Sequence, residues 1–281
     1  FIMGKDAVIS SLKTTTDYEH VGCGYVMVGP NDDKSAFGAN MNISGRIENA
    51  VLYINGQIAK SKGNVPNFNV HNTAVVNGGI YAAGYAKWNI EGADITGATG
   101  IEIRAGELTV SDNAKITGTS VPTTVTPNGN GSTTDGAGIA IAQHNTKLPI
   151  DVKISSGDIK GFSALYESNP QEISAENIAK VKIAVSGGNF TAINNGTMAI
   201  YSQDKDNFIT GGTFSDVSAL RYLAKEGNLD VNININNANS EFEAAGISIP
   251  EANNSKRNIT IDLNGSNWIG TNCYHSNQWL Y

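Results

Sequence analysis

Apolar and polar residues alternate along much of the chain, in short runs that end at Gly, Asn, Asp or Ser. The clearest run covers residues 183–190, with the sequence Ile-Ala-Val-Ser-Gly-Gly-Asn-Phe, and residues 208–214 repeat it as Phe-Ile-Thr-Gly-Gly-Thr-Phe. Alternation with a period of two, bounded by these residue types, is typical of β-strands. The paired glycines supply the positive φ angles that a sharp corner needs. The pattern therefore predicts short strands joined by tight corners.

The same motif recurs along the chain. Gly187 and Gly211 open the glycine pairs of the two best copies, and a looser copy at residues 152–159 contributes Gly157. The interval from Gly157 to Gly187 is somewhat longer than the interval from Gly187 to Gly211, and a fainter copy covers residues 41–47. Internal periods of about 20 to 50 residues indicate a solenoid, in which each repeat buries its apolar face against its neighbours. We therefore expect stacked turns, each about 4.8 Å further along the axis.

A second strand accompanies the motif in each turn. Residues 163–168 and 198–203 follow two of the copies, and residues 100–104 and 138–143 have the same character in earlier turns. We expect these four segments to be equivalent strands of successive turns. The alternation also predicts the side chains that point inward in stacked columns, which are Ile183, Val185, Phe190, Ile209 and Phe214.

Three segments depart from the regular pattern. Residues 120–135 are rich in Thr, Pro, Gly and Asn, which predicts a projecting loop. Residues 167–180 form an insertion, in which a cap at Ser174 followed by apolar residues predicts a one-turn helix. This insertion explains why one interval is longer than the next. Residues 217–225 have mixed helical character.

Three regions follow along the chain. Residues 41–265 are expected to form the solenoid, and residues 1–40 an N-terminal cap or first turn. Residues 266–281 are aromatic and turn-like, which predicts a C-terminal cap or an interface. Caps are expected because an open solenoid end exposes unpaired strand edges.

Charge and composition restrict the partners and the environment that the sequence predicts. The formal net charge is −7 and no run of Lys or Arg occurs, so nucleic acid is not an expected partner. No apolar stretch approaches the ~18 residues that predict membrane insertion.

The chain begins at Phe1 without a signal-peptide pattern, which we interpret as a processed or excised piece. Cys23 and Cys273 lie near opposite ends, so both are expected as thiols rather than a disulfide.

Asn is abundant, notably at residues 231–237, where Asn alternates with apolar residues. In stacked β-structure such side chains can bond from one turn to the next as amide ladders. The alternative is that Asn occupies turns.

The motifs also carry a family resemblance. Residues 100–110 have the sequence Gly-Ile-Glu-Ile-Arg-Ala-Gly-Glu-Leu-Thr-Val, residues 141–150 have Ile-Ala-Gln-His-Asn-Thr-Lys-Leu-Pro-Ile, and the Ser/Thr-Gly-Gly-x-Phe copies follow. Together, residues 100–217 resemble right-handed parallel β-helix repeat proteins, and more narrowly uncharacterised β-helical proteins of bacterial surfaces and bacteriophages. The resemblance implies an all-β, single-stranded right-handed parallel β-helix (a β-solenoid) with terminal caps and loop insertions. It does not imply one activity, because this fold hosts both enzymes and inert fibres.

The enzymes of that class resemble pectate lyases, polygalacturonases and tailspike glycosidases, which need clustered carboxylates. The candidate pair is Asp32 and Asp33, in a predicted loop, and its neighbours do not match the polygalacturonase pattern. No His pair has metal-ligand spacing, and no nucleophile elbow or phosphate-binding loop occurs, so the sequence predicts no metal and no cofactor. His144 lies at a predicted corner, where we expect it to form hydrogen bonds.

These observations predict a non-enzymatic structural or attachment protein, exposed on a virion as a phage fibre or decoration protein, or on a bacterial surface as an adhesin. The alternatives are a polysaccharide-acting β-helix lyase or glycosidase, and a glycan-binding module without turnover. Expected partners are other virion or cell-surface proteins, and glycans.

Apolar residues concentrate near the C-terminal end, and such patches usually mark interfaces. They are Trp268, Tyr274, Trp279, Leu280 and Tyr281. We expect a homo-oligomer, and the resemblance to phage β-helical fibres favours a trimer. The alternative is that these side chains fold back over the last turn of one subunit.

Overall fold

The computed structural model describes a nearly all-β chain. It covers residues 1–11, 24–28, 40–56, 65–122, 127–128, 131–132, 136–168, 175–196, 198–202, 209–215, 218–222, 229–234, 241–242, 247–248, 257–262 and 267–268. Within these residues every strand pair is parallel except one short hairpin, and the helix that they contain is α1 (Ala175–Ile178). The prediction of an all-β protein with parallel strands is confirmed.

The strands occupy three positions around a long axis. Sheet 1 contains β1 (Ile2–Met3), β4 (Asn40–Ile43), β7 (Asn67–Val70), β10 (Ala86–Glu91), β13 (Gly106–Ser111) and β18 (Ile150–Ile154). Sheet 2 contains β2 (Val8–Ser10), β5 (Arg46–Glu48), β8 (Val75–Asn77), β11 (Asp94–Gly97), β14 (Lys115–Gly118) and β19 (Asp158–Gly161). Sheet 3 contains β3 (Gly24–Val28), β6 (Ala50–Ile54), β9 (Ile80–Ala82), β12 (Ile101–Ile103), β17 (Ile139–Ala142), β20 (Ser163–Ser168), β22 (Met198–Ser202), β24 (Ser218–Tyr222) and β27 (Ile247–Ser248).

Sheets 1 and 2 are joined by one long strand, β21 (Val181–Ala192). Its first half pairs with β18 and its second half with β19. The joined sheet continues through β23 (Ile209–Ser215), β26 (Glu241–Phe242) and β29 (Asn267–Trp268). Two further pairs are the antiparallel β15 (Pro127–Asn128) and β16 (Gly131–Ser132), and the parallel β25 (Leu229–Asn234) and β28 (Arg257–Asp262).

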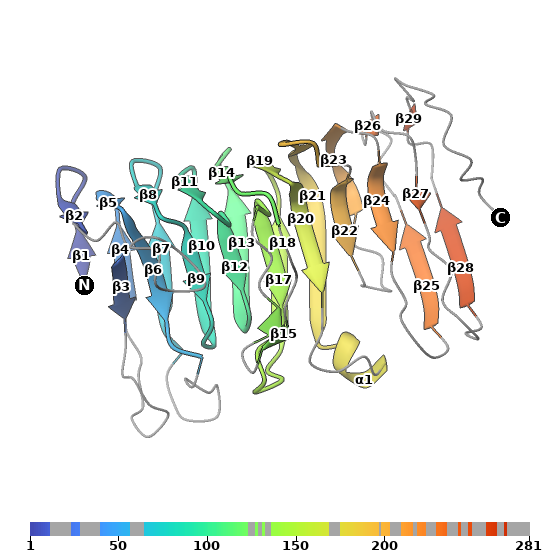
Figure 1. The fold of residues 1–281 in the computed structure, drawn as a ribbon, viewed down its shortest axis with the longest axis horizontal. Coiled ribbons are helices and arrows are strands. Elements are labelled where there is room, and N and C mark those ends of the chain that lie inside the picture. The colour runs from blue at the N-terminus through green and yellow to red at the C-terminus, as the bar shows by residue number, and fades with distance from the viewer. Residues whose placement is uncertain are drawn as a thin grey trace.

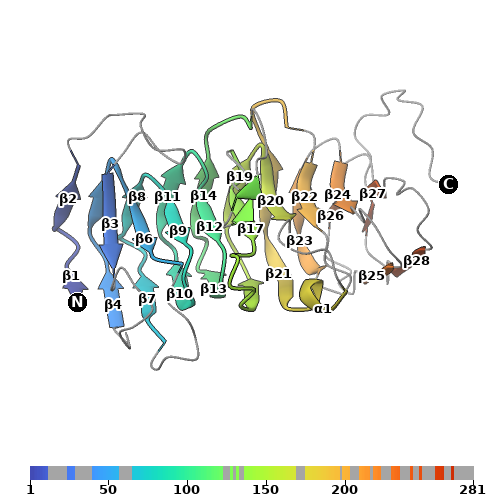
Figure 2. The ribbon, with the colours of Figure 1, turned by 60° about the horizontal axis from the view of Figure 1, so that its bottom comes forward.

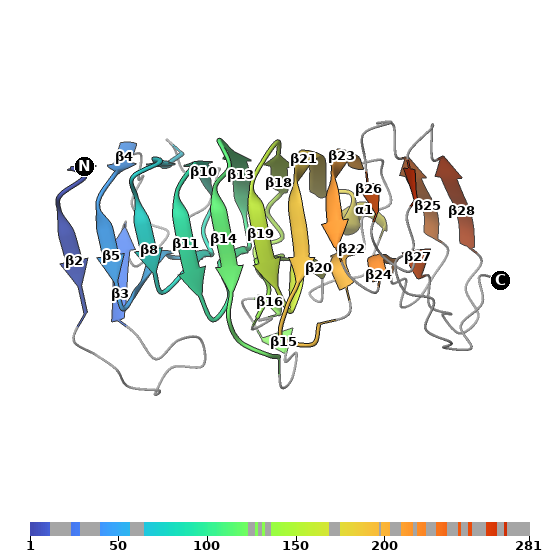
Figure 3. The same cartoon turned by 90° about the horizontal axis from the view of Figure 1, so that it is seen from above.

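From β1 to β20, each turn of the chain adds one strand to each of the three sheets. The chain passes through β4, β5 and β6, and then through β7, β8 and β9, which pair in parallel with the preceding three. Figures 1 and 2 show the turns stacked along the long axis from the N-terminus to the C-terminal strands. Figure 3 shows the strands of sheet 2 side by side in the same order. This stacked arrangement is compatible with a β-helix.

The strand register confirms most of the predicted repeats. Val185 pairs with Ile209 and Phe190 with Phe214, so the offset between the two best copies is confirmed (209 − 185 equals 211 − 187). The preceding interval was predicted from the positions of Gly157 and Gly187 (187 − 157). In the structure Asp158 pairs with Asn189 (189 − 158), so the interval is one position longer than predicted. In sheet 3, the four segments expected to be equivalent strands are β12, β17, β20 and β22, which pair in that order.

Apolar columns fill the space between the sheets. The predicted inward residues Ile183, Val185 and Phe190 are buried, and the strand positions of Ile209 and Phe214 continue their columns. In sheet 1 the corresponding positions of β4, β7 and β10 are Met41, Phe68 and Trp88. The Phe68 and Trp88 rings stack with centroids 3.8 Å apart and an interplanar angle of 10°. Burial of such columns is the main stabilising term in a fold of this kind.

Two predictions about irregular segments have different outcomes. The one-turn helix is confirmed as α1. The helical character expected at residues 217–225 is wrong for residues 218–222, which form β24 in parallel register with β22. Pairing with a preformed strand edge outweighs local propensity in short segments. Within the predicted loop 120–135, the described residues contain the β15–β16 hairpin.

Several predicted features lie wholly or partly outside the described residues. Asp32, Asp33, Cys23, Cys273, Tyr274, Trp279, Leu280 and Tyr281 are among them. Trp268 lies in β29, opposite Phe242 of β26. Strands β1, β2 and β3, from the region expected as a cap, pair with β4, β5 and β6. The limits 1–40, 41–265 and 266–281 stay predictions.

Candidate functional site

The outer side of sheet 1 carries a patch of asparagines. Since side chains alternate across a strand, the buried Met41, Phe68 and Trp88 leave their neighbours facing outward. The register sets these neighbours side by side from β4 through β7 to β10. We call the five asparagines the amide face: Asn40, Asn42, Asn67, Asn69 and Asn89.

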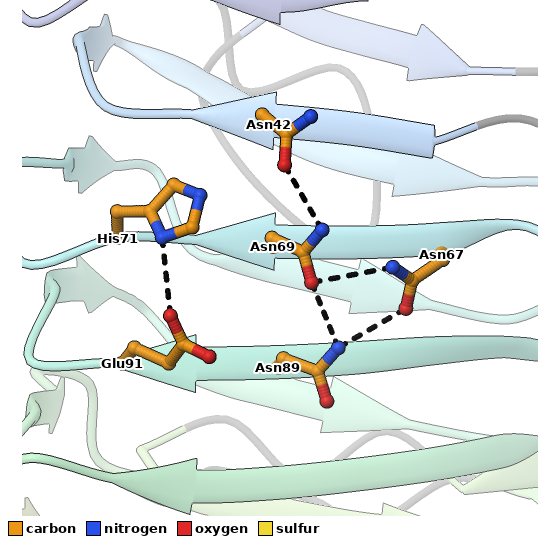
Figure 4. A network of polar contacts seen from close by, with 6 residues as sticks. All are labelled: Asn42, Asn67, Asn69, His71, Asn89 and Glu91. Atoms are coloured by element: carbon orange, nitrogen blue, oxygen red, sulfur yellow. Dashed lines mark hydrogen bonds and ion pairs between the residues drawn. The ribbon is translucent and has the colours of Figure 1, made fainter.

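Four of these side chains form one hydrogen-bond network across the three strands (Figure 4). Asn69 Nδ2 donates to Asn42 Oδ1 at 3.0 Å, and Asn89 Nδ2 donates to Asn69 Oδ1 at 2.9 Å. Asn89 Nδ2 also donates to Asn67 Oδ1 at 3.0 Å, and Asn67 Nδ2 donates to Asn69 Oδ1 at 3.2 Å. Amides therefore bond from turn to turn on this sheet, at positions other than residues 231–237, for which the ladder was predicted.

The network leaves hydrogen-bonding groups unused. A primary amide has two N–H donors and two acceptor positions. Within the described residues, the amide nitrogen of Asn42 and the amide oxygen of Asn89 take part in no hydrogen bond. Figure 4 shows both groups pointing away from the network. All four side chains are half-buried, so these groups remain accessible from the surface.

Pairs of ionisable side chains flank the amide face on both sides. Beyond one end of the strands, His71 Nδ1 lies 3.1 Å from Glu91 Oε2, with both side chains partly exposed (Figure 4). On the other side, Lys87 Nζ lies 3.4 Å from Glu107 Oε2, whose other carboxylate oxygen accepts a hydrogen bond from Tyr85 at 3.3 Å. The surface around the amides is therefore polar, with acidic and basic side chains close to each other.

A second polar cluster lies on sheet 3 and is closed. The guanidinium of Arg104 is fully buried and donates to Glu102 Oε1 at 2.5 Å. The same guanidinium lies 5.0 Å from the centroid of the Tyr81 ring, which stacks on Tyr53 with centroids 5.4 Å apart. Burial raises the pKa of Tyr53, and the nearby Arg104 charge opposes this.

His144 completes this cluster. Its Nδ1 lies 3.1 Å from Thr146 Oγ1 and accepts a hydrogen bond from the Thr146 backbone N–H at 3.2 Å, which confirms the expected hydrogen-bonding role. Burial, and to a smaller extent Arg104, lower the pKa of His144 to about 4, so the ring is neutral at pH 7. The ring fills the space above Gly56, where a Cβ atom would overlap it.

A further buried contact ties α1 to the same region. Asn177 Nδ2 donates to Gln143 Oε1 at 2.6 Å, and Gln143 Nε2 donates to the Leu148 carbonyl at 3.2 Å. Arg104, Gln143 and His144 are buried and the Tyr53 and Tyr81 rings are partly exposed, so most polar groups of this cluster are withdrawn from the surface. The amide face is therefore the candidate site.

The amide face was not predicted from the sequence. An amide ladder was predicted instead at residues 231–237, where the register sets Asn232 opposite Thr260 and Asn234 opposite Asp262. The signal for the amide face was the run Asn-Phe-Asn at 67–69, with Asn42 and Asn89 flanked by apolar residues.

The described residues contain no cluster of three His, Cys, Asp or Glu side chains that could hold a metal ion. None of the helices described is long and apolar enough to cross a membrane. No family model, curated protein or solved structure matches the chain.

Proposed function

We propose that the protein is a non-enzymatic structural or attachment element, exposed on a virion or on a bacterial surface. Its frame is a single-stranded right-handed parallel β-helix with terminal caps. Two facts support this frame: successive turns pair in parallel, and connections between parallel strands of one sheet are right-handed in about 98% of cases.

The amide face is the observation that carries the proposal. It is an open, uncharged hydrogen-bonding surface on stacked strands that hold it rigidly. Such a surface makes polar contacts with a partner but supplies neither acid nor nucleophile. Other carboxylates on sheets 1 and 2 lie close to cations, as in Asp151 with Lys153 at 3.2 Å and Asp158 with Lys160 at 2.7 Å.

Location is tested by immunogold labelling with an antibody raised against this chain. Intact cells and purified virions of the source organism are labelled in parallel with permeabilised cells. We expect gold on the outer surface of cells or particles. Label confined to the interior of permeabilised cells would overturn the proposal.

Turnover is tested separately with isolated bacterial surface polysaccharide and with pectin. Released reducing ends and absorbance of unsaturated products are followed over time. We expect neither to rise. Turnover that disappears in Asp32→Ala or Asp33→Ala would instead identify a lyase or glycosidase.

We also propose that the protein works as a homo-oligomer, most simply a trimer, through its C-terminal aromatic residues. Trp268 continues the stack in β29, and Tyr274, Trp279, Leu280 and Tyr281 follow it in sequence. Apolar side chains gathered at one end of a polar molecule are typical of interfaces.

A further inference from the structure

We propose that the amide face binds an uncharged glycan through its hydroxyl groups. This inference rests on the proposed attachment function and names its ligand. Three features of the amide face support it: the placement of the asparagines, their unused hydrogen-bonding groups and the charge around them.

The fold does not require asparagine at these positions. Asn is depleted in β-strands, where β-branched and aromatic residues are favoured. The column through Asn42, Asn69 and Asn89 continues in the next turns with Thr109 and Lys153, so the stack accepts other side chains at this position. The amides are therefore a local feature of three turns rather than a requirement of the fold.

The unused groups match sugar hydroxyls. A hydroxyl both donates and accepts, so a ligand with several hydroxyls can bond to a donor and to an acceptor at separate points along its length. The amide face offers both, because the Asn42 nitrogen is a donor and the Asn89 oxygen is an acceptor. These two groups lie at opposite ends of one network, separated by the Asn69 amide (Figure 4).

The network also holds its amides in place before a ligand arrives. Asn69 accepts from Asn67 and from Asn89 and donates to Asn42, so its side chain has one conformation. Ordering of side chains is one of the main costs of binding, and a preformed network reduces it.

Charge selects against ionic ligands. The amides carry no charge, and the flanking carboxylates are Glu91, beside His71, and Glu107, beside Lys87. An anionic glycan would bring a carboxylate or sulfate toward these carboxylates, and Lys87 already contacts Glu107, on a molecule of net charge −7. A neutral glycan meets no such repulsion.

The geometry also sets the direction of binding. Successive asparagines of the column are spaced by one strand, about 4.8 Å, along the stack axis. A glycan that contacts Asn42, Asn69 and Asn89 therefore runs across the strands. No aromatic ring belongs to the amide face, so single-site binding is weak, and useful attachment depends on several copies acting together.

The test is binding of the full chain, biotinylated and displayed on streptavidin, to a printed array of neutral, sialylated and uronate-containing oligosaccharides. The test variant is Asn69→Thr with Asn89→Thr, which copies the threonine at position 109 of the same column. The matched control is Asn77→Thr, an exposed asparagine of sheet 2 whose neighbour in β11 is Thr96. Circular dichroism confirms that all three proteins keep the β-fold.

We expect binding to neutral oligosaccharides, reduced at least tenfold in the Asn69→Thr, Asn89→Thr variant and unchanged in Asn77→Thr. Binding to acidic glycans alone, equal binding by the double variant, or no binding at all would overturn the inference. Surface location by immunogold is a separate measurement. The immunogold result therefore tests the attachment function independently of whether the protein binds a glycan.

Discussion

Individual charged residues of the stack are paired in different ways. On sheet 3, Arg104 and Glu102 are buried together, whereas on sheet 2 Arg46 and Glu48 form a comparable pair at the surface, 2.7 Å apart. The two pairs have the same spacing along the chain. Their contributions to stability should differ, because removal of one partner from a buried pair leaves a charge in a medium that solvates it poorly.

We predict that Arg104→Met lowers the free energy of unfolding by about 3 to 5 kcal/mol. The reason is that Glu102 keeps its buried position and loses the guanidinium beside it. Urea unfolding followed by circular dichroism measures the change. Arg46→Met, which removes the exposed pair, should change the value by less than about 1 kcal/mol. Equal losses in the two variants would show that Arg104 is not held in a buried ion pair.

We predict that His144 makes the fold less stable as the pH falls from 6.5 to about 4. Its native pKa is lowered to about 4, so over this range the unfolded chain binds the proton and the native ring does not. Stability therefore rises with pH between these values and is lost on acidification, by up to about 3 kcal/mol for this group. The charged group that opposes protonation is Arg104.

The measurement is the urea midpoint of the full chain at pH 7 and at pH 4.5, compared with that of His144→Asn. The variant should lose less stability on acidification than the native protein. An identical pH dependence in the two proteins would mean that His144 titrates alike in the native and unfolded states.

At the scale of strands and corners, close contact between turns depends on particular glycines. Gly106 begins β13 with φ +97°, and a Cβ atom there would overlap the carbonyl oxygen of Ala86 in the preceding turn. Gly4 lies in the first turn with open space around the position of a Cβ atom. The two glycines thus differ in both backbone conformation and surroundings.

We predict that Gly106→Ala lowers stability by at least about 1 to 3 kcal/mol, the cost of a strained backbone conformation, with the overlap adding to it. Gly4→Ala should stay within about 0.5 kcal/mol of the native protein. Thermal unfolding followed by circular dichroism compares them. A Gly106→Ala variant as stable as Gly4→Ala would contradict the tight spacing between β10 and β13.

The sequence predicted the strands and most of their stacking, because alternation marks the inward residues and paired glycines mark corners. The interval that was one position too short has a physical reason. The glycines with positive φ in these copies are Gly157, Gly188 and Gly212, so the second glycine of each pair turns the corner. Gly157 is therefore equivalent to Gly188, whereas the motif had aligned it with Gly187.

The candidate site was harder to predict, because it depends on turns of unequal length. Asn42 and Asn69 are 27 apart in sequence number and Asn69 and Asn89 are 20 apart, so no fixed period aligns them. The buried cluster around Arg104 could not be predicted from the sequence for a different reason. Alternation marks Glu102 as an outward residue of its strand, whereas in the structure its side chain is buried beside Arg104.

In the whole molecule, the stacked turns place the amide face and the C-terminal strands at different positions along the long axis. The amide face lies in the N-terminal half of the stack on sheet 1, while the aromatic residues proposed as an interface belong to the C-terminal end of the chain (Figure 1). Association through the C-terminal end would leave the amide faces of all subunits free. Several weak sites on one particle then bind with an effective affinity far above that of each site.

We predict that the full chain is a trimer and that a chain lacking residues 268–281 is a monomer. Removal of the C-terminal aromatic residues takes away the apolar area that holds the subunits together. Light scattering at micromolar concentration should give three times the chain mass of 29.6 kDa for the full protein and about one chain mass for the truncated one. The control is Phe1→Ser with Ile2→Ser, which removes exposed apolar side chains from the opposite end and should leave the trimer intact. A monomeric full chain, or a trimer that survives the truncation, would contradict the prediction. If the aromatic residues instead cover the last turn of their own subunit, truncation lowers the unfolding temperature and leaves the mass of the particle at one chain throughout.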